Sequence, residues 1–147
     1  MRIYLACTVR GDRGTITTAR HIHDCLVGLG HDVLTGHLLE DDVDSAESSL
    51  LDSEVFARDV RWLESAGAIV AEASGSSYGV GFEVGYTLGR AAQTGQRVLV
   101  LYDVTRRGKL SRLISGLSDP RAQVLAYESP DEIGPFLEQH LGAGRVR

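Results

Sequence analysis

The chain has 147 residues, of which 43% are apolar, and its net charge is −5. This length suits a single domain over residues 1–147 with one core, and the apolar share argues against wholesale disorder. The negative charge disfavours a nucleic-acid-binding module, because such modules carry a basic surface for the phosphate backbone.

Targeting and metal motifs are not evident in the sequence. Cys7 and Cys25 are the only cysteines and form no C-x-x-C pair, so neither a zinc site nor a redox motif is expected. No apolar run approaches the about 18 residues that indicate a membrane span, and the opening "MRIYLAC" is too short for a signal peptide. We therefore expect a cytoplasmic protein without a metal or cofactor, and without nucleic-acid or membrane partners.

Five short apolar runs, each bounded by polar residues or glycine, predict buried strands at 2–7, 31–35, 68–72, 97–102 and 123–127. Helical spacing of apolar residues predicts helices at 17–29, 50–66, 81–92, 110–117 and 130–141. This alternation indicates an α/β fold: a doubly wound, Rossmann-like or flavodoxin-like parallel sheet of five strands with helices on both faces. Such sheets bind ligands beyond the carboxyl ends of their strands, here after Ala6, Thr35 and Glu72.

The segment at 37–49, "HLLEDDVDSAESS", is predicted to be an acidic loop. It is either a solvated connector or a lid over the site. His37 at its start follows the second strand, where it either reaches a ligand or is simply solvated.

Asp59 interrupts the apolar stripe of the predicted helix at 50–66, four residues after Val55 and four before Leu63. A carboxylate on the core side of a helix is costly unless it is paired or used. Burial would favour its protonated form, which suits a proton donor. The alternative is that Arg58 or Arg61 pairs with it, or that it lies at a wet edge.

Glu83 is the one charged residue in "GVGFEVGY", which follows "SGSS" and the third strand. Small residues before a helix let a ligand approach the backbone, and the free N–H groups of the first turn attract anions. Ser77 adds a hydroxyl. In the first turn the helix dipole would favour ionised Glu83, a usable nucleophile, although simple charge complementarity there is common.

The first strand supplies a second candidate anion pocket. It leads into "CTVRGDRGT", where Thr8, Arg10 and Gly11 follow its carboxyl end. Tyr4 lies within the strand, and a lone strand tyrosine is more often part of the core than of a catalytic site.

Taken together, Tyr4, "CTVRG", "RDVRWLESAGAIVAE" and "SSYGVGFEVG" resemble the nucleoside 2-deoxyribosyltransferase superfamily, and within it the 2′-deoxynucleoside 5′-monophosphate N-hydrolases. The resemblance covers the chain to about residue 127. It implies a doubly wound α/β domain that cleaves the N-glycosidic bond of a deoxynucleotide and releases base and deoxyribose 5-phosphate.

The resemblance also implies roles for single residues. Glu83 matches the nucleophile that forms a glycosyl intermediate, Asp59 the acid that protonates the leaving base, and Tyr4 the residue that orients the nucleophile. His37 matches a histidine that lies near the base of the nucleotide in family members. The residues implied to bind the phosphate are Thr8, Val9, Arg10, Gly11, Ser77 and Gly79. Ser111 matches a serine that reaches the phosphate of the adjacent subunit, with Leu113 beside it, which implies a homodimer with composite sites.

The sequence departs from the family pattern at three places. Thr8 replaces a usual serine but keeps the hydroxyl, and Leu113 replaces a common methionine, which leaves base selectivity open. The chain ends in "GAGRVR", without the asparagine-bearing tail that the classical transferases use, which favours water as the acceptor. The alternatives are a ribonucleotide N-glycosidase of the CMP type, a deoxyribosyltransferase and a non-catalytic nucleotide-binding module.

Overall fold

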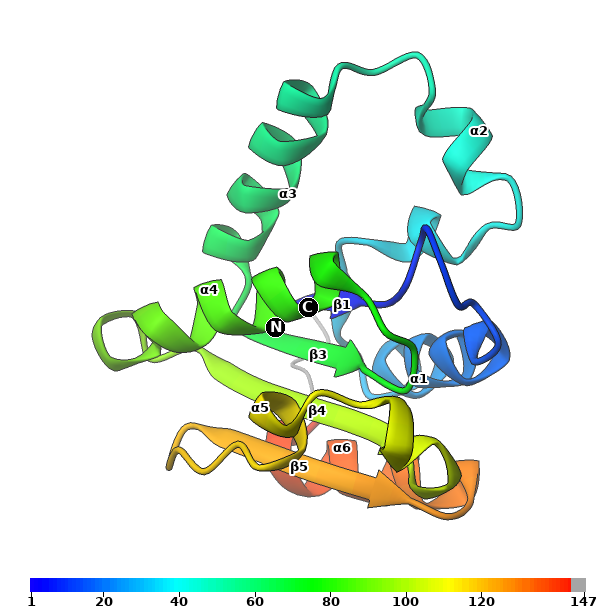
Figure 1. Ribbon diagram of the computed structural model, residues 1–147. Coiled ribbons are helices and arrows are strands. Elements are labelled where there is room, and N and C mark those ends of the chain that lie inside the picture. Colours follow the sequence, from blue (N-terminus) through cyan, green and yellow to red (C-terminus); the bar gives the residue numbers. More distant parts are fainter. Residues whose placement is uncertain (144–147) are drawn as a thin grey trace.

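The computed structural model describes residues 1–143, so part of the C-terminal segment at 142–147 lies outside the described residues. Its sheet has five parallel strands in the order β2-β1-β3-β4-β5, as Figure 1 shows. The strands are β1 (Arg2–Ala6), β2 (Asp32–Val33), β3 (Ala68–Glu72), β4 (Arg97–Asp103) and β5 (Ala122–Tyr127). The predicted five-stranded parallel sheet is therefore confirmed.

The second strand is shorter than predicted, because a side chain takes over its pairing. The Thr35 hydroxyl donates to Leu5 O at 2.6 Å and accepts from Leu5 N at 3.0 Å. Thr35 Oγ1 thus bonds to both the N–H and the C=O of Leu5. In a longer second strand, backbone groups would have made these two bonds instead.

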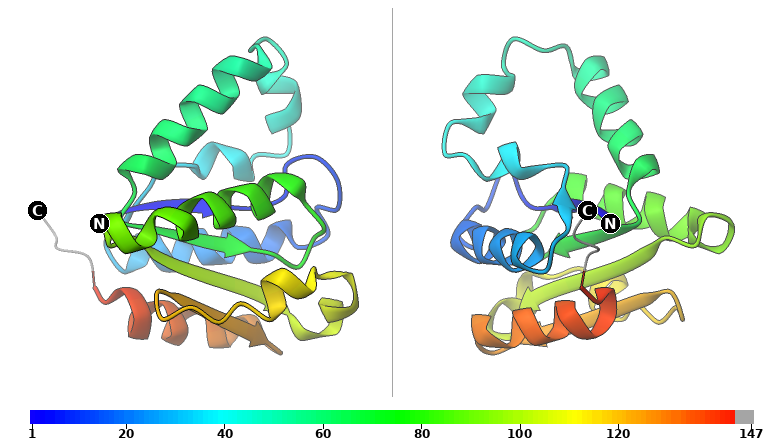
Figure 2. Two further views of the ribbon diagram at one scale, coloured as in Figure 1. Left: turned by 60° about the vertical axis from the view of Figure 1, so that its left-hand side comes forward. Right: turned by 180° about the vertical axis from the view of Figure 1, so that it is seen from behind.

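Helices cover both faces of the sheet (Figures 1 and 2). On one face, Ile3 and Leu5 pack with α1 (Ile16–Gly28) and α6 (Ile133–Leu141). On the other, Tyr4 and Ala6 pack in a second core with residues of α3 (Asp52–Ser65), α4 (Tyr78–Thr94) and α5 (Arg112–Ser115). The alternation of side chains along β1 thus places Tyr4 on the face that α3 and α4 cover.

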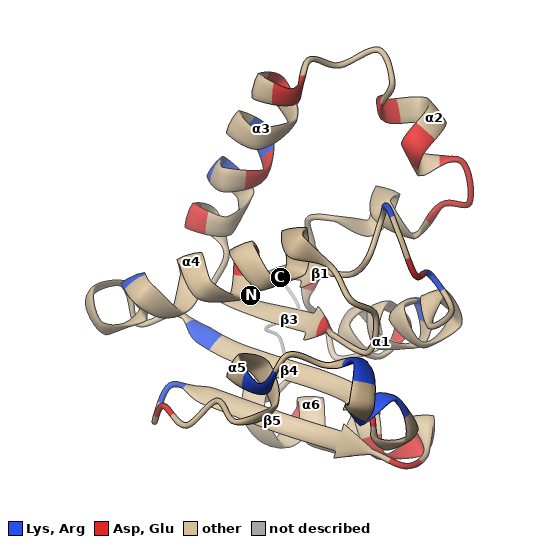
Figure 3. Ribbon diagram, viewed as in Figure 1, with Lys and Arg blue, Asp and Glu red and all other residues tan. Residues whose placement is uncertain are grey.

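The segment at 37–49 is largely helical, which corrects the predicted loop. It contains η1 (Gly36–Leu39) and α2 (Val43–Glu47), and the remaining 3₁₀ turns are η2 (Val104–Lys109) and η3 (Pro130–Glu132). Leu38, Leu39 and Val43 are buried in the first core and hold the segment down. Most of its acidic residues are exposed, whereas the Glu47 side chain is only 15% exposed. Helix α2 lies above the carboxyl edge of the sheet, and α3 descends from it towards the amino end of β3 (Figures 1 and 3).

The strand order reverses direction between β1 and β3, which are neighbours in the sheet. From β1 the chain goes outward to β2, whereas from β3 it goes to β4 and β5 on the other side. Loops that leave the two central strands diverge there and open a crevice, the usual ligand site of such sheets. No helix within residues 1–143 is long and apolar enough to cross a membrane.

Candidate active site

Tyr4 and Glu83 form the centre of the site. Tyr4 is fully buried in β1, and its hydroxyl donates a hydrogen bond of 2.5 Å to Glu83 Oε1 on α4. Burial raises the pKa of Glu83 to about 7, although the Tyr4 hydrogen bond acts in the opposite direction. Burial and the Glu83 charge raise the pKa of Tyr4, so Tyr4 stays a donor at neutral pH. Near neutrality Glu83 can therefore exchange between the carboxylate and the acid.

This electrostatic picture corrects the dipole argument made from the sequence. Helix α4 begins at Tyr78 and not at Gly81, with Ser77 as its N-cap, so Glu83 lies in the second turn. The dipole acts mainly within the first turn. Desolvation consequently outweighs it, and the protonated form of Glu83 is favoured relative to an exposed glutamate.

Asp59 on α3 belongs to the same electrostatic cluster, since its negative charge contributes to raising the pKa of Glu83. Arg58 Nε donates to Asp59 Oδ1 at 2.8 Å, and Arg58 Nη2 donates to Glu47 Oε1 at 2.5 Å. The three side chains are each less than a quarter exposed. Asp59 is therefore paired with Arg58, which is one of the alternatives that the sequence left open.

Aromatic and polar groups continue this cluster from α3 towards η1. The Trp62 ring lies 4.9 Å below the Arg58 guanidinium and packs edge-on against His37, with 5.3 Å between the ring centres. His37 Nε2 is buried and lies 3.5 Å from Glu47 Oε1, but it makes no hydrogen bond there within the described chain. His37 is thus placed beside the Arg58–Asp59 pair, with a ring nitrogen still able to bond to a ligand.

The two predicted anion pockets meet as one cradle at the ends of β1 and β3. A Cβ built on Gly75 would lie 2.8 Å from Thr8 Oγ1 and 2.6 Å from Asp12 O, so only glycine fits there. Gly11 adopts a φ of 115°, which also requires glycine, and lies against the Ser76 carbonyl. Thr8 Oγ1 is buried, and nothing in residues 1–143 satisfies it. An unsatisfied buried hydroxyl is costly unless a ligand completes it.

Helix α4 supplies the other side of the cradle. The Ser77 hydroxyl accepts from Val80 N at 3.3 Å, which leaves its own proton free to be donated. The first N–H groups of a helix, here those of Tyr78 and Gly79, have no partner within the helix. Val9 is half-buried, and its side chain packs against the first core. Arg10 does not complete the cradle in this structure, because Asp44 of α2 binds it at 2.5 Å.

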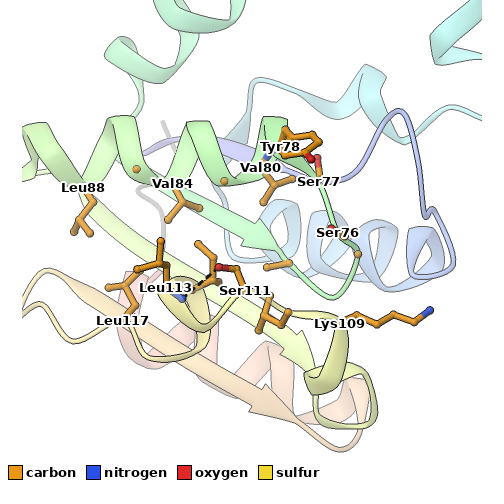
Figure 4. Close-up of a pocket in the computed structure, with 16 residues that line it drawn as sticks. Ser76, Ser77, Tyr78, Val80, Val84, Leu88, Lys109, Ser111, Leu113 and Leu117 are labelled. Atoms are coloured by element: carbon orange, nitrogen blue, oxygen red, sulfur yellow. Dashed lines mark hydrogen bonds between the residues drawn. The ribbon is translucent and has the colours of Figure 1, made fainter.

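Ser111 and Leu113 lie apart from Glu83, on the opposite flank of α4. They line a pocket of about 510 Å³ between α4 and α5, together with Val84 and Leu88 and with Gly75 and Ser77 of the cradle (Figure 4). The Ser111 hydroxyl caps α5 by accepting from Leu113 N at 3.3 Å. Helical spacing points Glu83 away from the face that carries these residues. The structure therefore does not bring Ser111 into the Glu83 site of its own chain.

Relatives of known name share nearly the whole chain, although no family model matches it. The chain is 38% identical over 141 residues to the "Putative 2′-deoxynucleoside 5′-phosphate N-hydrolase 1" of Thermofilum pendens, over 96% of this chain and 95% of the relative. It is 36% identical over 143 residues to the 5-hydroxymethyl-dUMP N-hydrolase of Danio rerio, over 96% of each. The chain belongs to the 2′-deoxynucleoside 5′-phosphate N-hydrolase family.

A solved structure supports the fold of this N-hydrolase family member. The CMP N-glycosidase BcmB of Clostridium botulinum superposes with a TM-score of 0.66 at 16% identity, over 96% of this chain and all of the other. The recognition made from the sequence, the doubly wound fold and the enzyme class are thereby confirmed, the last being a hydrolase of N-glycosyl compounds.

Sequence reasoning missed several groups of this candidate site. Glu47 was treated only as part of an acidic segment, and Trp62 appeared within the motif "RDVRWLESAGAIVAE" without a role in the site. Gly75 was noted as a small residue but not as a position that excludes every other side chain. The spacing of Arg58 and Trp62, four apart on one helix, was a signal for the stacked pair.

Proposed function

We propose that this chain hydrolyses the N-glycosidic bond of 2′-deoxynucleoside 5′-monophosphates to the free base and 2-deoxyribose 5-phosphate. The observation that carries the proposal is the buried Tyr4–Glu83 pair, electrostatically coupled to Asp59 and set beside a cradle with an unsatisfied hydroxyl. The names of the relatives, which act on deoxynucleoside phosphates, support this substrate class.

In the first step, ionised Glu83 attacks C1′ of the sugar while the bond from C1′ to the base nitrogen breaks. The bonding electrons leave with the base, which takes a proton from Asp59, and a glycosyl ester of Glu83 remains. Water then attacks C1′, Asp59 accepts its proton, and Glu83 leaves as a carboxylate. This is the two-step, retaining logic of glycosidases. Tyr4 orients the Glu83 oxygen that does not attack.

The Arg58 contact imposes a condition on the acid step. Asp59 must carry a proton to donate it, and its Oδ1 already accepts a hydrogen bond from Arg58 Nε at 2.8 Å. Glu47 holds the same guanidinium at 2.5 Å and His37 lies beside Glu47. Arg58 therefore keeps Glu47 as a counter-charge while Asp59 exchanges its proton with the substrate.

The phosphate group occupies the cradle in this account. Thr8 Oγ1, the Ser77 hydroxyl and the backbone N–H groups of Val9, Gly11 and Gly79 are its donors, as anion sites at helix starts commonly use. Arg10 joins them by exchanging Asp44 for phosphate; this exposed ion pair costs little to break.

The active form is a homodimer in this proposal, with Ser111 reaching the phosphate in the partner's site. Two observations support it. Ser111 is separated from Glu83 of its own chain by α4, and Leu113 beside it is 86% exposed next to an apolar pocket. Burying such a side chain against a second copy would remove apolar surface from water.

The deciding experiment follows base release by chromatography from a panel of deoxy- and ribonucleoside monophosphates and free nucleosides. Turnover of the deoxynucleotides, with a decline of activity on the acid side of pH 7 as Glu83 becomes protonated, is the expected result. Glu83→Ala should bind nucleotide but lose nearly all turnover. Glu138→Ala, which replaces an exposed glutamate on α6, should keep the turnover of the wild type. Near-normal turnover by a folded Glu83→Ala variant would contradict the proposal.

The panel also separates the alternatives. A transferase needs an acceptor base and accepts unphosphorylated deoxynucleosides, and a CMP-type enzyme prefers ribonucleotides. Asp59→Asn tests the acid step, since an acid matters most for a poor leaving group. Equal loss across bases of very different leaving ability would contradict that role.

A further inference from the structure

Glu72 is a buried carboxylate that the proposed reaction does not use. It is the last residue of β3, it is 1% exposed, and it forms no ion pair within residues 1–143. Four donors surround it instead: the Thr15 hydroxyl at 2.6 Å, the Tyr127 hydroxyl at 3.1 Å, and both the backbone N–H, at 3.3 Å, and the hydroxyl of Ser74. Burial of a charge is tolerated only with such compensation.

The donors suit a carboxylate, which only accepts hydrogen bonds. Both groups of Ser74 and the Tyr127 hydroxyl converge on Oε1, and the Thr15 hydroxyl bonds to Oε2. Because Ser74 spends its proton on Glu72, its oxygen is free to accept, and it takes Asp103 N at 2.8 Å. Glutamine would disturb this arrangement, because its NH₂ group must replace one oxygen. At the Oε2 position the Thr15 hydroxyl would have to turn and accept, and at the Oε1 position the Ser74 backbone N–H would be left unsatisfied.

The bonds around Glu72 connect the carboxyl ends of β3, β4 and β5 with the loop that follows β1. Thr15 is the residue before α1 and ends the loop that follows β1, while Ser74 lies in the β3–α4 loop. Asp103 ends β4, and Tyr127 ends β5. Ser74 is followed directly by Gly75, whose backbone approaches Thr8 and the loop after β1 too closely for any Cβ. Glu72 thereby determines where the two halves of the cradle meet.

We propose that Glu72 is a positioning residue which, through Ser74 and Thr15, holds the loops at 8–12 and 74–77 in the spacing that fits a phosphate group. The inference rests on the proposed function in one respect, namely that this cradle takes the 5′-phosphate of the substrate. Glu72 itself does not touch the substrate. Its effect should therefore appear in phosphate affinity and not in the chemical step.

The test compares Glu72→Gln, Ser74→Ala and Tyr127→Phe with the wild type, and Tyr102→Phe serves as a control from a buried tyrosine of β4 without a bond to Glu72. The first three variants should raise KM for a deoxynucleoside monophosphate, roughly 10-fold or more for Glu72→Gln, and leave kcat within a few-fold. Calorimetric titration with 2-deoxyribose 5-phosphate should show the same loss of affinity, while Tyr102→Phe binds as the wild type does.

Unchanged affinity for 2-deoxyribose 5-phosphate in folded Ser74→Ala and Tyr127→Phe would overturn the inference, even if Glu72→Gln failed to fold. So would an equal fall in kcat/KM for a nucleotide and for its phosphate-free nucleoside, because that indicates a general loss of structure. The two proposals fail separately. A wild type that binds 2-deoxyribose 5-phosphate in a Glu72-dependent way but releases no base contradicts only the proposed function.

Discussion

Replacing Glu83 by glutamine should stabilise the fold at alkaline pH while it abolishes turnover. Burial raises the pKa of Glu83 from an ordinary value near 4.5 to about 7. The folded state therefore holds a proton that the unfolded chain releases, so wild-type stability falls as pH rises from about 4.5 through 7. Glutamine has no charge to desolvate, and its oxygen can still accept from Tyr4.

The size of this effect follows from the two pKa values. One pH unit between them corresponds to about 1.4 kcal/mol, so the ionised side chain costs the fold about 3 kcal/mol at pH 8 and about 1 kcal/mol at pH 5. These are upper values, because Glu83 retains some contact with solvent. For a chain of this length, 1 kcal/mol corresponds to roughly 2–4 °C in Tm. Glu83→Gln should thus gain several degrees at pH 8 and clearly less at pH 5.

Denaturant and thermal unfolding of the wild type, Glu83→Gln and Glu138→Gln at pH 5, 6.5 and 8 measure this difference. The free-energy gap between Glu83→Gln and wild type should widen by about 2 kcal/mol from pH 5 to pH 8. The difference in unfolding free energy between Glu138→Gln and wild type should not change with pH, since that side chain is exposed on α6. A gap for Glu83→Gln that is equally flat would show that the carboxylate is not desolvated, and the reasoning on its pKa would be wrong.

Three other variants test separate parts of the site. Tyr4→Phe removes the hydroxyl that lowers the pKa of Glu83, so the acid limb of the pH–activity profile should move to higher pH and kcat should fall roughly 10-fold; an unmoved limb would contradict this. Gly75→Ala, whose Cβ would lie 2.6 Å from a backbone oxygen, should raise KM for nucleotides, whereas Gly28→Ala has open space and should not. Leu113→Asp should sediment as a monomer with weakened nucleotide binding; an unchanged dimer would exclude this face as the interface.

The sheet and the helix order could be predicted because each depends on local patterns. Buried parallel strands read as short apolar runs, and the strand at 68–72 was predicted with its observed bounds. The start of α4 was missed because glycines in its first turn weaken the helical pattern, and the N-cap bond of Ser77 decides the boundary. The helices within 37–49 were missed because their stability comes from three apolar contacts with the core rather than from periodicity.

The candidate reactive residues could be selected from the sequence, but their electrostatics could not be predicted. The motif around Glu83 and the stripe around Asp59 identified both residues. Whether burial or the helix dipole controls the pKa of Glu83 depends on the tertiary contact with Tyr4, 79 residues away in the chain. The same holds for Glu72, since two of its four donors, the hydroxyls of Thr15 and Tyr127, come from segments 57 and 55 residues away. The cytoplasmic location expected from the sequence stays a prediction.

The most direct test of the account is to identify the residue that becomes covalently attached to the sugar. The protein would be mixed with a deoxynucleoside monophosphate carrying fluorine at C2′, which slows an oxocarbenium-like step, then quenched, digested and mapped by mass spectrometry. The account predicts the mass of the sugar phosphate on the peptide that contains Glu83, and its loss in Glu83→Gln. An adduct on another residue, or base release with inversion at C1′ and no adduct, would contradict it.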